Sequence, residues 1–371
     1  MNHINVPIKL KILHSNEEVA NVLLETIYEI GASKIALIST KTPTHLITNM
    51  LEVFLFEKVE KLKTFQVVNA SISYVNQLPL SDFELVVGIG GGKVIDTAKY
   101  AAHINNIPCI SIPTTVSNDG ICSPIAVLKD KGNKHKSLGA KIPVAMLVPL
   151  HLIKQSEEET IISGIGDLLS NITAIEDWKL ANKETKERID DYSVIVSETA
   201  AKNVLLEIQK YILLNKKKEQ FLNENIEMII NSLALSGIAM EIAGTSRPAS
   251  GAEHLISHAI DELFGGIKQH GIQVAFGTYI VRFIMSKLGY ITNNQFEELR
   301  AVFRYLELPT TLTSMNITKD QLIKAIQCAP KTRENRYTVL NKIKLDTETL
   351  DDVLDILFGP KSNFISEKSR F

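Results

Sequence analysis

The first 150 residues alternate short runs of β-branched and apolar residues with segments of helical periodicity. Continuous apolar strands joined through helices are typical of a parallel sheet that helices cover on both faces, and right-handed crossovers make such a sheet doubly wound. We therefore expect an α/β domain with a doubly wound parallel sheet over residues 1–155. Its predicted strands are 34–39, 64–69, 85–89 and 108–112, and helices are predicted at 45–55 and 93–103.

From about residue 156 onward, long helical periodicities dominate and strand patterns almost vanish. This pattern predicts an all-helical second domain over residues 156–371. A chain of 371 residues is long enough for two domains, each with its own hydrophobic core. The predicted helices are 164–181, 192–211, 224–243, 251–264, 272–288, 294–306 and 319–327.

Composition excludes several classes of partner. The net charge is -2, which gives no reason to expect a nucleic acid or a membrane surface as partner. The three cysteines include no CxxC pair, which indicates a reducing compartment rather than a disulfide framework. The N-terminal MNHINVPIKLKILHS lacks a signal-peptide core, and no apolar run approaches the ~20 residues that span a bilayer. We expect a cytoplasmic protein.

A glycine-rich segment, GIGGGKVIDTAKYAA, connects the third predicted strand to a helix. Backbone N–H groups can approach a phosphate there because no Cβ intervenes, and the helix that begins near Lys93 adds its positive N-terminal dipole. The spacing differs from GxGxxG, and no Lys-Ser/Thr pair completes a P-loop. A tight turn alone is the alternative, but it does not need three consecutive glycines. The segment therefore predicts a nucleotide-phosphate loop.

The next predicted strand ends in PTTVSNDGICSP. Thr114, Thr115 and Ser117 place hydroxyls at the carboxyl end of a strand, where ligands of α/β proteins gather. Asn118-Asp119-Gly120 is equally consistent with a simple turn, because Asx side chains bond to nearby backbone groups. The segment is a candidate second wall of the nucleotide site.

Histidines cluster in SRPASGAEHLISHAIDELFGGIKQHG. His254 and His258 are four residues apart and so share one helix face, and His270 follows at or just before the start of another helix. Imidazoles on rigid elements suit zinc, which in catalytic sites has three protein ligands and an open position. Asp167, in GIGDLLSN, is the best candidate for an oxygen ligand. Because helical histidine pairs also occur on surfaces and in cores, spacing alone leaves a structural role open.

Together, GGGKVIDTAK, PTTVSNDGICSP, GIGDLLSN, SRPASGAEHLISH and the later His-Gly resemble the sn-glycerol-1-phosphate dehydrogenase family. That family belongs to the superfamily of glycerol dehydrogenase, iron-containing alcohol dehydrogenases and dehydroquinate synthase. The resemblance covers roughly residues 34–277. It implies a dehydroquinate-synthase-like fold and a homo-oligomeric enzyme of lipid biosynthesis that uses zinc and NAD or NADP. The implied reaction is reduction of dihydroxyacetone phosphate to sn-glycerol 1-phosphate.

The resemblance also implies roles for single residues. Asp167, His254 and His270 would hold zinc, which acts as a Lewis acid on the C2 oxygen of the substrate. His258 would contact the substrate or relay a proton, and Asp119 would bind substrate hydroxyls. The residues that would line the dinucleotide are Gly91, Gly92, Lys93, Val94, Asp96, Thr114, Thr115, Ser117 and Ser123.

Two further residues bear on the choice of substrate and cofactor. The substrate phosphate needs a local cation, and we predict Arg247, seven residues before His254; a helix-capping arginine is the alternative. NAD-selective enzymes tend to place a carboxylate after the first strand, where this chain has Lys41, which favours NADP or dual use.

Two other functions remain open. One is a dehydrogenase of an unphosphorylated polyol, similar to glycerol dehydrogenase. The other is a cyclase similar to dehydroquinate synthase, which uses NAD only transiently.

Overall fold

The computed structural model describes residues 9–41, 44–132 and 134–359, so most of the N-terminal segment considered above lies outside it. The chain forms two compact units. The first comprises residues 1–161 together with 233–244, and the second comprises 162–232 and 245–371. The predicted boundary at residue 155 falls near the first division, whereas the return of 233–244 to the first unit is not predicted from the sequence.

The first unit contains a six-stranded parallel sheet with the strand order β1-β8-β5-β4-β2-β3. The strands predicted at 34–39, 85–89 and 108–112 are confirmed. The strand predicted at 64–69 lies three residues earlier. Its pairing with β2 begins at Lys61, opposite Lys34, and ends at Gln66, opposite Ser39. The strands are β1 Lys9–Leu13, β2 Lys34–Ser39, β3 Lys61–Gln66, β4 Leu85–Gly90, β5 Cys109–Pro113 and β8 Ala145–Pro149.

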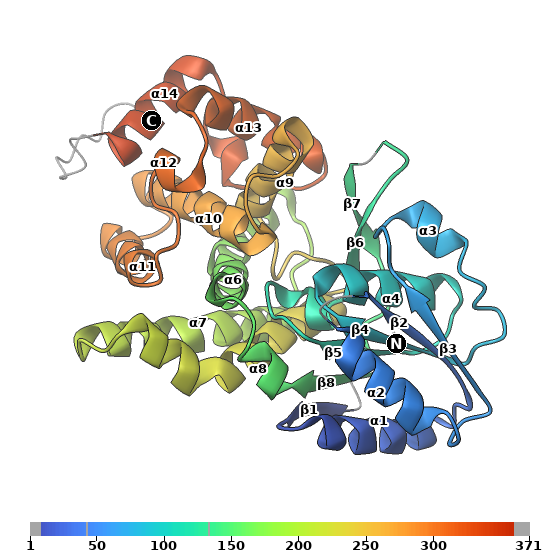
Figure 1. Cartoon of the computed structure of the whole chain (residues 1–371). Helices are drawn as coiled ribbons and strands as arrows, with labels where there is room; N and C mark the ends of the chain where they lie inside the picture. Colours follow the sequence, from blue (N-terminus) through green and yellow to red (C-terminus); the bar gives the residue numbers. More distant parts are fainter. Residues whose placement is uncertain (1–8, 42–43, 133, 360–371) are drawn as a thin grey trace. The chain divides into compact units, whose positions relative to one another are not determined.

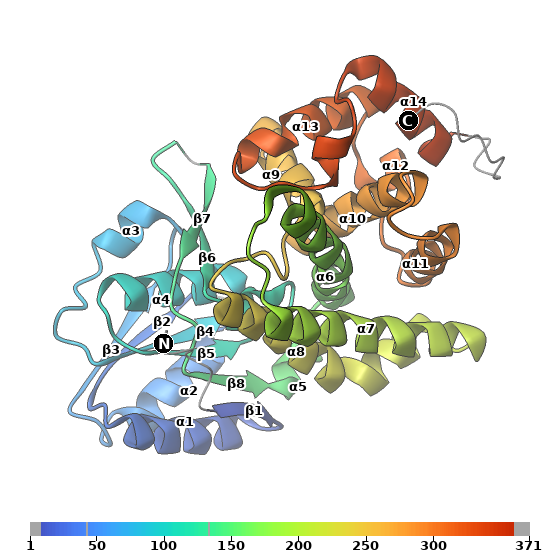
Figure 2. The same ribbon diagram turned by 180° about the vertical axis from the view of Figure 1, so that it is seen from behind.

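Helices cover both faces of this sheet (Figures 1 and 2). Alternate residues of β2 separate into two cores: Ile35 packs with the cluster that includes helices α1 (Asn16–Ile30) and α2 (His45–Leu55). Ala36 packs with the cluster that includes α3 (Ile72–Asn76) and α4 (Gly92–Ile104). Because successive side chains of a strand point to opposite faces, this division confirms the doubly wound α/β architecture. The hairpin β6 (Ile125–Lys129) and β7 (His135–Gly139) is separate from the sheet.

The second unit is helical, and each helix predicted from the sequence beyond residue 156 is present. Helix α9 packs against both α10 and α13. Two helices, α12 and α14, are not predicted from the sequence. The helices after β8 are α5 Leu150–Ile153, α6 Glu158–Thr185, α7 Asp191–Leu213, α8 Lys218–Ala243, α9 Ala252–Phe264, α10 His270–Lys287, α11 Asn293–Tyr305, α12 Leu312–Met315, α13 Lys319–Thr332 and α14 Thr347–Phe358.

Helix α8 is long and apolar enough to cross a membrane by length and composition, contrary to the expectation that no segment approaches that limit. However, 56% of its most apolar window is buried inside the structure. A mostly buried apolar helix is typical of the core of a soluble protein. We therefore interpret α8 as a core helix.

Candidate functional site

The glycine-rich loop forms the start of α4. Gly91 occupies the N-cap position without a side-chain cap, so the first backbone N–H groups of the helix remain available to a ligand. Gly90 accepts a hydrogen bond from the backbone N–H of Thr114 at 3.0 Å, which places the two predicted walls of the nucleotide site side by side. A Cβ atom on Gly91 would come within 3.0 Å of the Thr115 hydroxyl. This uncapped helix start fits a dinucleotide diphosphate.

Sequence reasoning missed Lys99, which anchors the segment after β5. Its side chain is fully buried, and its ammonium donates hydrogen bonds to the backbone carbonyls of Gly120, at 2.6 Å, and of Ile125. The ammonium also lies 3.0 Å from a carboxylate oxygen of Asp96 and 3.4 Å from the hydroxyl of Ser123. A buried ammonium is stable only with such oxygen partners. Asp96 and Ser123, which we expect along the cofactor, therefore also form this cage around Lys99.

We expect Lys99→Met to lower the free energy of unfolding by about 3–5 kcal/mol, because the variant leaves the Asp96 carboxylate without its buried cation. The affinity for NADPH, one of the two cofactors that the family resemblance implies, should fall as well, since Lys99 anchors the segment that follows Thr114 and Thr115. Calorimetry and fluorescence titration with NADPH measure the two effects. Lys131→Met removes the same charge from an exposed position and is the matched control. Unchanged stability of Lys99→Met would contradict this role.

Asp119 and its neighbours form the turn that the sequence left open. The Asn118 side chain accepts a hydrogen bond from the backbone N–H of Gly120 at 2.9 Å, so the Asx turn is confirmed. The Asp119 carboxylate accepts a hydrogen bond from the hydroxyl of Ser236 at 2.9 Å. Ser236 lies in the part of α8 that belongs to the first unit. The role of Asp119 toward substrate hydroxyls remains a prediction.

Asp167 of α6, His254 of α9 and His270 of α10 converge in the second unit. One ligand atom from each residue lies within 4.8 Å of the others. A carboxylate oxygen of Asp167 is 3.5 Å from Nε2 of His254 and 3.8 Å from Nε2 of His270. Zinc bonds of about 2.0–2.2 Å place tetrahedral ligand atoms about 3.3–3.6 Å apart, so small side-chain shifts accommodate the ion. These three residues fit a divalent metal.

His258 lies beside this cluster but is not part of it. Its ring centroid is 6.1 Å from that of His254 and 6.5 Å from that of His270. The helical spacing correctly places His254 and His258 on neighbouring turns, but the cluster that could hold a metal pairs His254 with His270 instead. This arrangement is the one that the family resemblance implies.

Close helix packing brings the three candidate ligands together. A Cβ atom on Gly271 would lie 1.9 Å from the backbone carbonyl oxygen of Ser163 in α6. A Cβ atom on Gly277 would lie 2.6 Å from the carbonyl oxygen of Glu253 in α9. Only glycine permits such approaches. Since Gly271 follows His270 and Glu253 precedes His254, these contacts set the distances between the ligands.

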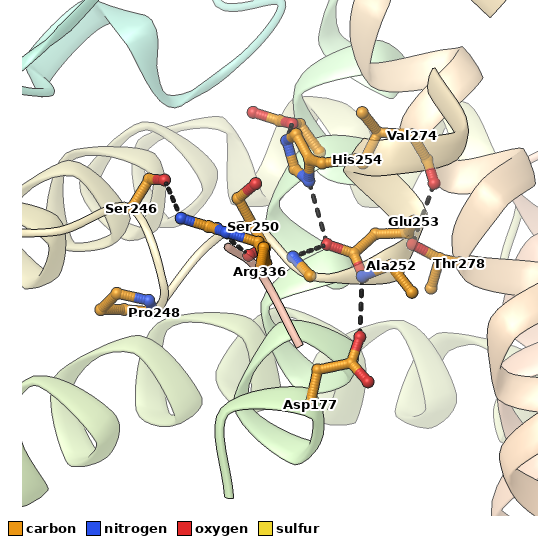
Figure 3. Close-up of polar contacts among 12 residues, drawn as sticks. Asp177, Ser246, Pro248, Ser250, Ala252, Glu253, His254, Val274, Thr278 and Arg336 are labelled. Atoms are coloured by element: carbon orange, nitrogen blue, oxygen red, sulfur yellow. Dashed lines mark hydrogen bonds and ion pairs between the residues drawn. The ribbon is translucent and has the colours of Figure 1, made fainter. Parts of the chain in front are cut away.

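Two buried carboxylates orient α9 and its histidine (Figure 3). Glu253 accepts a hydrogen bond from the backbone N–H of Gly251 and lies 3.0 Å from Nδ1 of His254. Asp177, from α6, accepts hydrogen bonds at 2.7 Å from the backbone N–H groups of Ala252 and Val339. With Nδ1 of His254 held by Glu253, Nε2 is the nitrogen directed toward Asp167. Burial and the charge of Glu253 raise the pKa of Asp177 to about 8.

The charges around the two neighbouring histidines differ. Burial lowers the pKa of His254, but hydrogen bonds with Asp167 and Glu253 outweigh burial and raise this pKa to about 9. The two carboxylates thus create a field that favours positive charge at this position, as a metal site requires. Burial, followed by the charge of Arg333, lowers the pKa of His258 well below its usual value. His258 is therefore a neutral imidazole.

Arg247 is buried and already has an anionic partner. Its Nε donates a hydrogen bond to Glu187 at 2.6 Å, its Nη2 donates a second one to the same carboxylate, and its Nη1 donates to the carbonyl of Tyr337 at 2.8 Å. Glu187 therefore neutralises the guanidinium. This geometry favours a structural role for Arg247 over the predicted contact with a substrate phosphate.

Comparisons with known proteins identify the family of this chain. Residues 14–156 match the family model described as iron-containing alcohol dehydrogenase. The chain is 36% identical to glycerol-1-phosphate dehydrogenase [NAD(P)+] of Archaeoglobus fulgidus over 275 aligned residues. These residues make up 74% of this chain and 76% of the relative. It is 40% identical to the enzyme of the same name from Methanococcus aeolicus over 268 aligned residues, which make up 70% of this chain and 74% of that relative.

Solved structures show the same fold. A probable glycerol dehydrogenase from Sinorhizobium meliloti superposes with a TM-score of 0.71 at 19% identity, over 96% of this chain and 97% of that one. Glycerol dehydrogenase from Schizosaccharomyces pombe gives a TM-score of 0.70 at 21% identity, over 96% and 90%. The expected fold, a parallel-sheet domain followed by a helical region, is therefore confirmed.

Proposed function

Because this chain belongs to the iron-containing alcohol dehydrogenase family and is a metal-dependent NAD(P) dehydrogenase, we propose that it reduces dihydroxyacetone phosphate to sn-glycerol 1-phosphate. Relatives at 36–40% identity that carry the name glycerol-1-phosphate dehydrogenase support this substrate. The single observation that carries the proposal is the convergence of Asp167, His254 and His270.

We propose zinc as the metal. One carboxylate and two imidazoles are a donor set that zinc prefers, and they leave a coordination position open for substrate. When bound, the ion draws charge from the carbonyl oxygen of the substrate as the carbonyl is reduced. Asp167 contributes the negative charge, and Glu253 fixes the orientation of the His254 ring.

Other residues have the remaining roles. The uncapped first turn of α4 at Gly91 and Gly92 binds the diphosphate of NADH or NADPH, and the reduced nicotinamide supplies the hydride. His258 is neutral, so its ring can accept the proton of the C2 hydroxyl when the alcohol is oxidised, and the resulting imidazolium would return a proton to the C2 oxygen in the direction of reduction. Asp119 contacts the substrate hydroxyls. Lys41 supports use of NADP alongside NAD.

The test is a nicotinamide assay with and without a chelator. We expect dihydroxyacetone phosphate to oxidise NADH or NADPH, loss of activity after chelation, and recovery with Zn²⁺. Chiral analysis of the product should give sn-glycerol 1-phosphate. Equal activity on unphosphorylated dihydroxyacetone would favour a polyol dehydrogenase, and turnover without net change in NADH would favour a cyclase.

We also infer a homo-oligomer in the cytoplasm. Apolar side chains of α7, including Leu206 and Leu213, are largely exposed and suit contacts between copies. Cys109 and Cys122 are buried free thiols, and burial raises the pKa of each to about 12, which keeps them unreactive. Free cysteines are consistent with a reducing compartment.

A further inference from the structure

Two arginines that follow α13 lie close to the metal centre. Arg333 donates a hydrogen bond to the hydroxyl oxygen of Ser246 at 2.7 Å, and Arg336 donates to the same oxygen at 3.0 Å. Arg336 also donates to the carbonyl of Ser250, immediately before α9 (Figure 3). The two guanidinium groups are therefore held side by side, on one hydroxyl, at the start of the helix that carries His254.

Neither arginine has a carboxylate within ion-pair distance in the part of the chain that the structure describes. Arg247, in the same neighbourhood, is neutralised by Glu187. Burial, followed by the charges of Arg333 and Arg247, lowers the pKa of Arg336 to about 9. Two like charges in a partly buried position repel each other, and a bound anion removes this repulsion.

Further polar groups at this position are available to a ligand. Ser250 is 4% exposed, and its hydroxyl has no hydrogen-bond partner among the described residues. The hydroxyl of Ser246 accepts from both arginines and so still has its own proton to donate. Buried hydroxyls normally have a hydrogen-bond partner, so the lone Ser250 hydroxyl indicates a ligand contact.

The arginine pair also lies near the reacting end of the substrate. Arg336 contacts the carbonyl of Ser250, which precedes α9, and His254 and His258 lie on the first two turns of that helix. The His258 ring in turn neighbours both candidate metal-binding histidines. A short substrate can therefore place its carbonyl at the metal and its anionic end at the arginines.

We propose that Arg333 and Arg336, together with the Ser250 hydroxyl, bind the phosphoryl group of a phosphate monoester substrate. The proposal rests on the proposed function, whose substrate carries this group. Two guanidinium groups match the charge of a phosphate dianion, and each can donate paired hydrogen bonds to its oxygens. Arg247 then holds the surrounding segments together through Glu187 and the Tyr337 carbonyl.

The experiment compares Arg333→Met, Arg336→Met and Arg336→Lys with the wild-type protein. We expect kcat/KM for dihydroxyacetone phosphate to fall about 10- to 100-fold in each methionine variant, the range for a lost charged hydrogen bond. Activity on unphosphorylated dihydroxyacetone should fall far less than activity on dihydroxyacetone phosphate, because that substrate makes no phosphoryl contact. Arg336→Lys keeps the charge but not the paired donors, so its loss should be smaller.

Lys331→Met is the matched control, because it removes one exposed positive charge from the same segment. Metal content is measured in every variant. Arg333→Met loses only the contact with Ser246, so its activity tests the proposal even if Arg336→Met disturbs α9. Inorganic phosphate should inhibit the wild-type protein in competition with dihydroxyacetone phosphate, and inhibit the methionine variants far more weakly.

The outcomes separate this inference from the proposed function. If the wild-type protein prefers dihydroxyacetone phosphate but Arg333→Met and Arg336→Met both keep its kcat/KM, the arginine site is wrong and the function stands. If phosphate binds in an arginine-dependent way but dihydroxyacetone phosphate is not reduced, the anion site stands and the proposed function fails.

Discussion

Replacement of Asp167 by alanine should abolish stoichiometric metal binding and reduce the reductase activity by roughly a thousandfold or more. Asp167 is the only one of the three candidate ligands that carries a negative charge, and it is 3% exposed. Its loss removes both a ligand and the attraction for a divalent ion, and with them several kcal/mol of charge stabilisation during reduction. Elemental analysis of the dialysed protein and the nicotinamide assay measure the two effects.

His258→Asn is the matched comparison, since His258 neighbours the same rings without belonging to the ligand cluster. This variant should keep one metal ion per chain and lose activity through kcat, because proton transfer contributes about 10²- to 10⁴-fold. A metal-free His258→Asn protein, or a fully loaded Asp167→Ala protein, would mean that the assignment of ligands is incorrect.

The second large effect concerns a residue that touches neither metal nor substrate. Gly271→Ala should destabilise the second unit by at least about 2 kcal/mol, because the new Cβ atom would overlap the Ser163 carbonyl and push α10 from α6. This displacement moves His270 away from Asp167, so the affinity for Zn²⁺ should fall as well. Urea unfolding of the metal-free protein and a competitive chelator titration measure the two changes.

Gly289→Ala is the control for this variant, near the other end of the same helix. Gly289 has a φ of +75°, but no atom lies within 4 Å of an added Cβ. Alanine there should cost about 1 kcal/mol of backbone strain and leave Zn²⁺ affinity unchanged. Similar metal affinities in the two alanine variants would show that the contact between α6 and α10 does not position His270.

Local pattern predicts most of this fold because the buried strands are continuous apolar runs. KIALIS is β2 from its first residue to its last, since both of its faces are covered. Strand β3 lies at the edge of the sheet and carries lysines, so its apolar residues alone do not define its ends. Strand β1, KLKIL, has the same mixed composition and is not predicted from the sequence.

The site depends more on distant contacts. Helical spacing relates His254 to His258, but it contains no information about which face of α9 meets α6 and α10. The resemblance to a family supplies the grouping with Asp167 and His270. The partners that orient the site, Asp177 and Glu253, are fully buried, but the sequence does not distinguish Asp177 from the other acidic residues of α6. The neutralisation of Arg247 depends on Glu187, which lies in a loop sixty residues away in sequence.

The cage around Lys99 has a consequence for how the nucleotide loop responds to its surroundings. Proteins also use carbonyl oxygens as ligands to bind potassium or sodium ions. Here the charge is tethered to α4 by a covalent bond, so dialysis cannot remove it and no dissolved monovalent ion has to occupy its place. The Lys99 ammonium thus takes the place that a bound monovalent cation would otherwise occupy among these carbonyl oxygens and the Asp96 carboxylate.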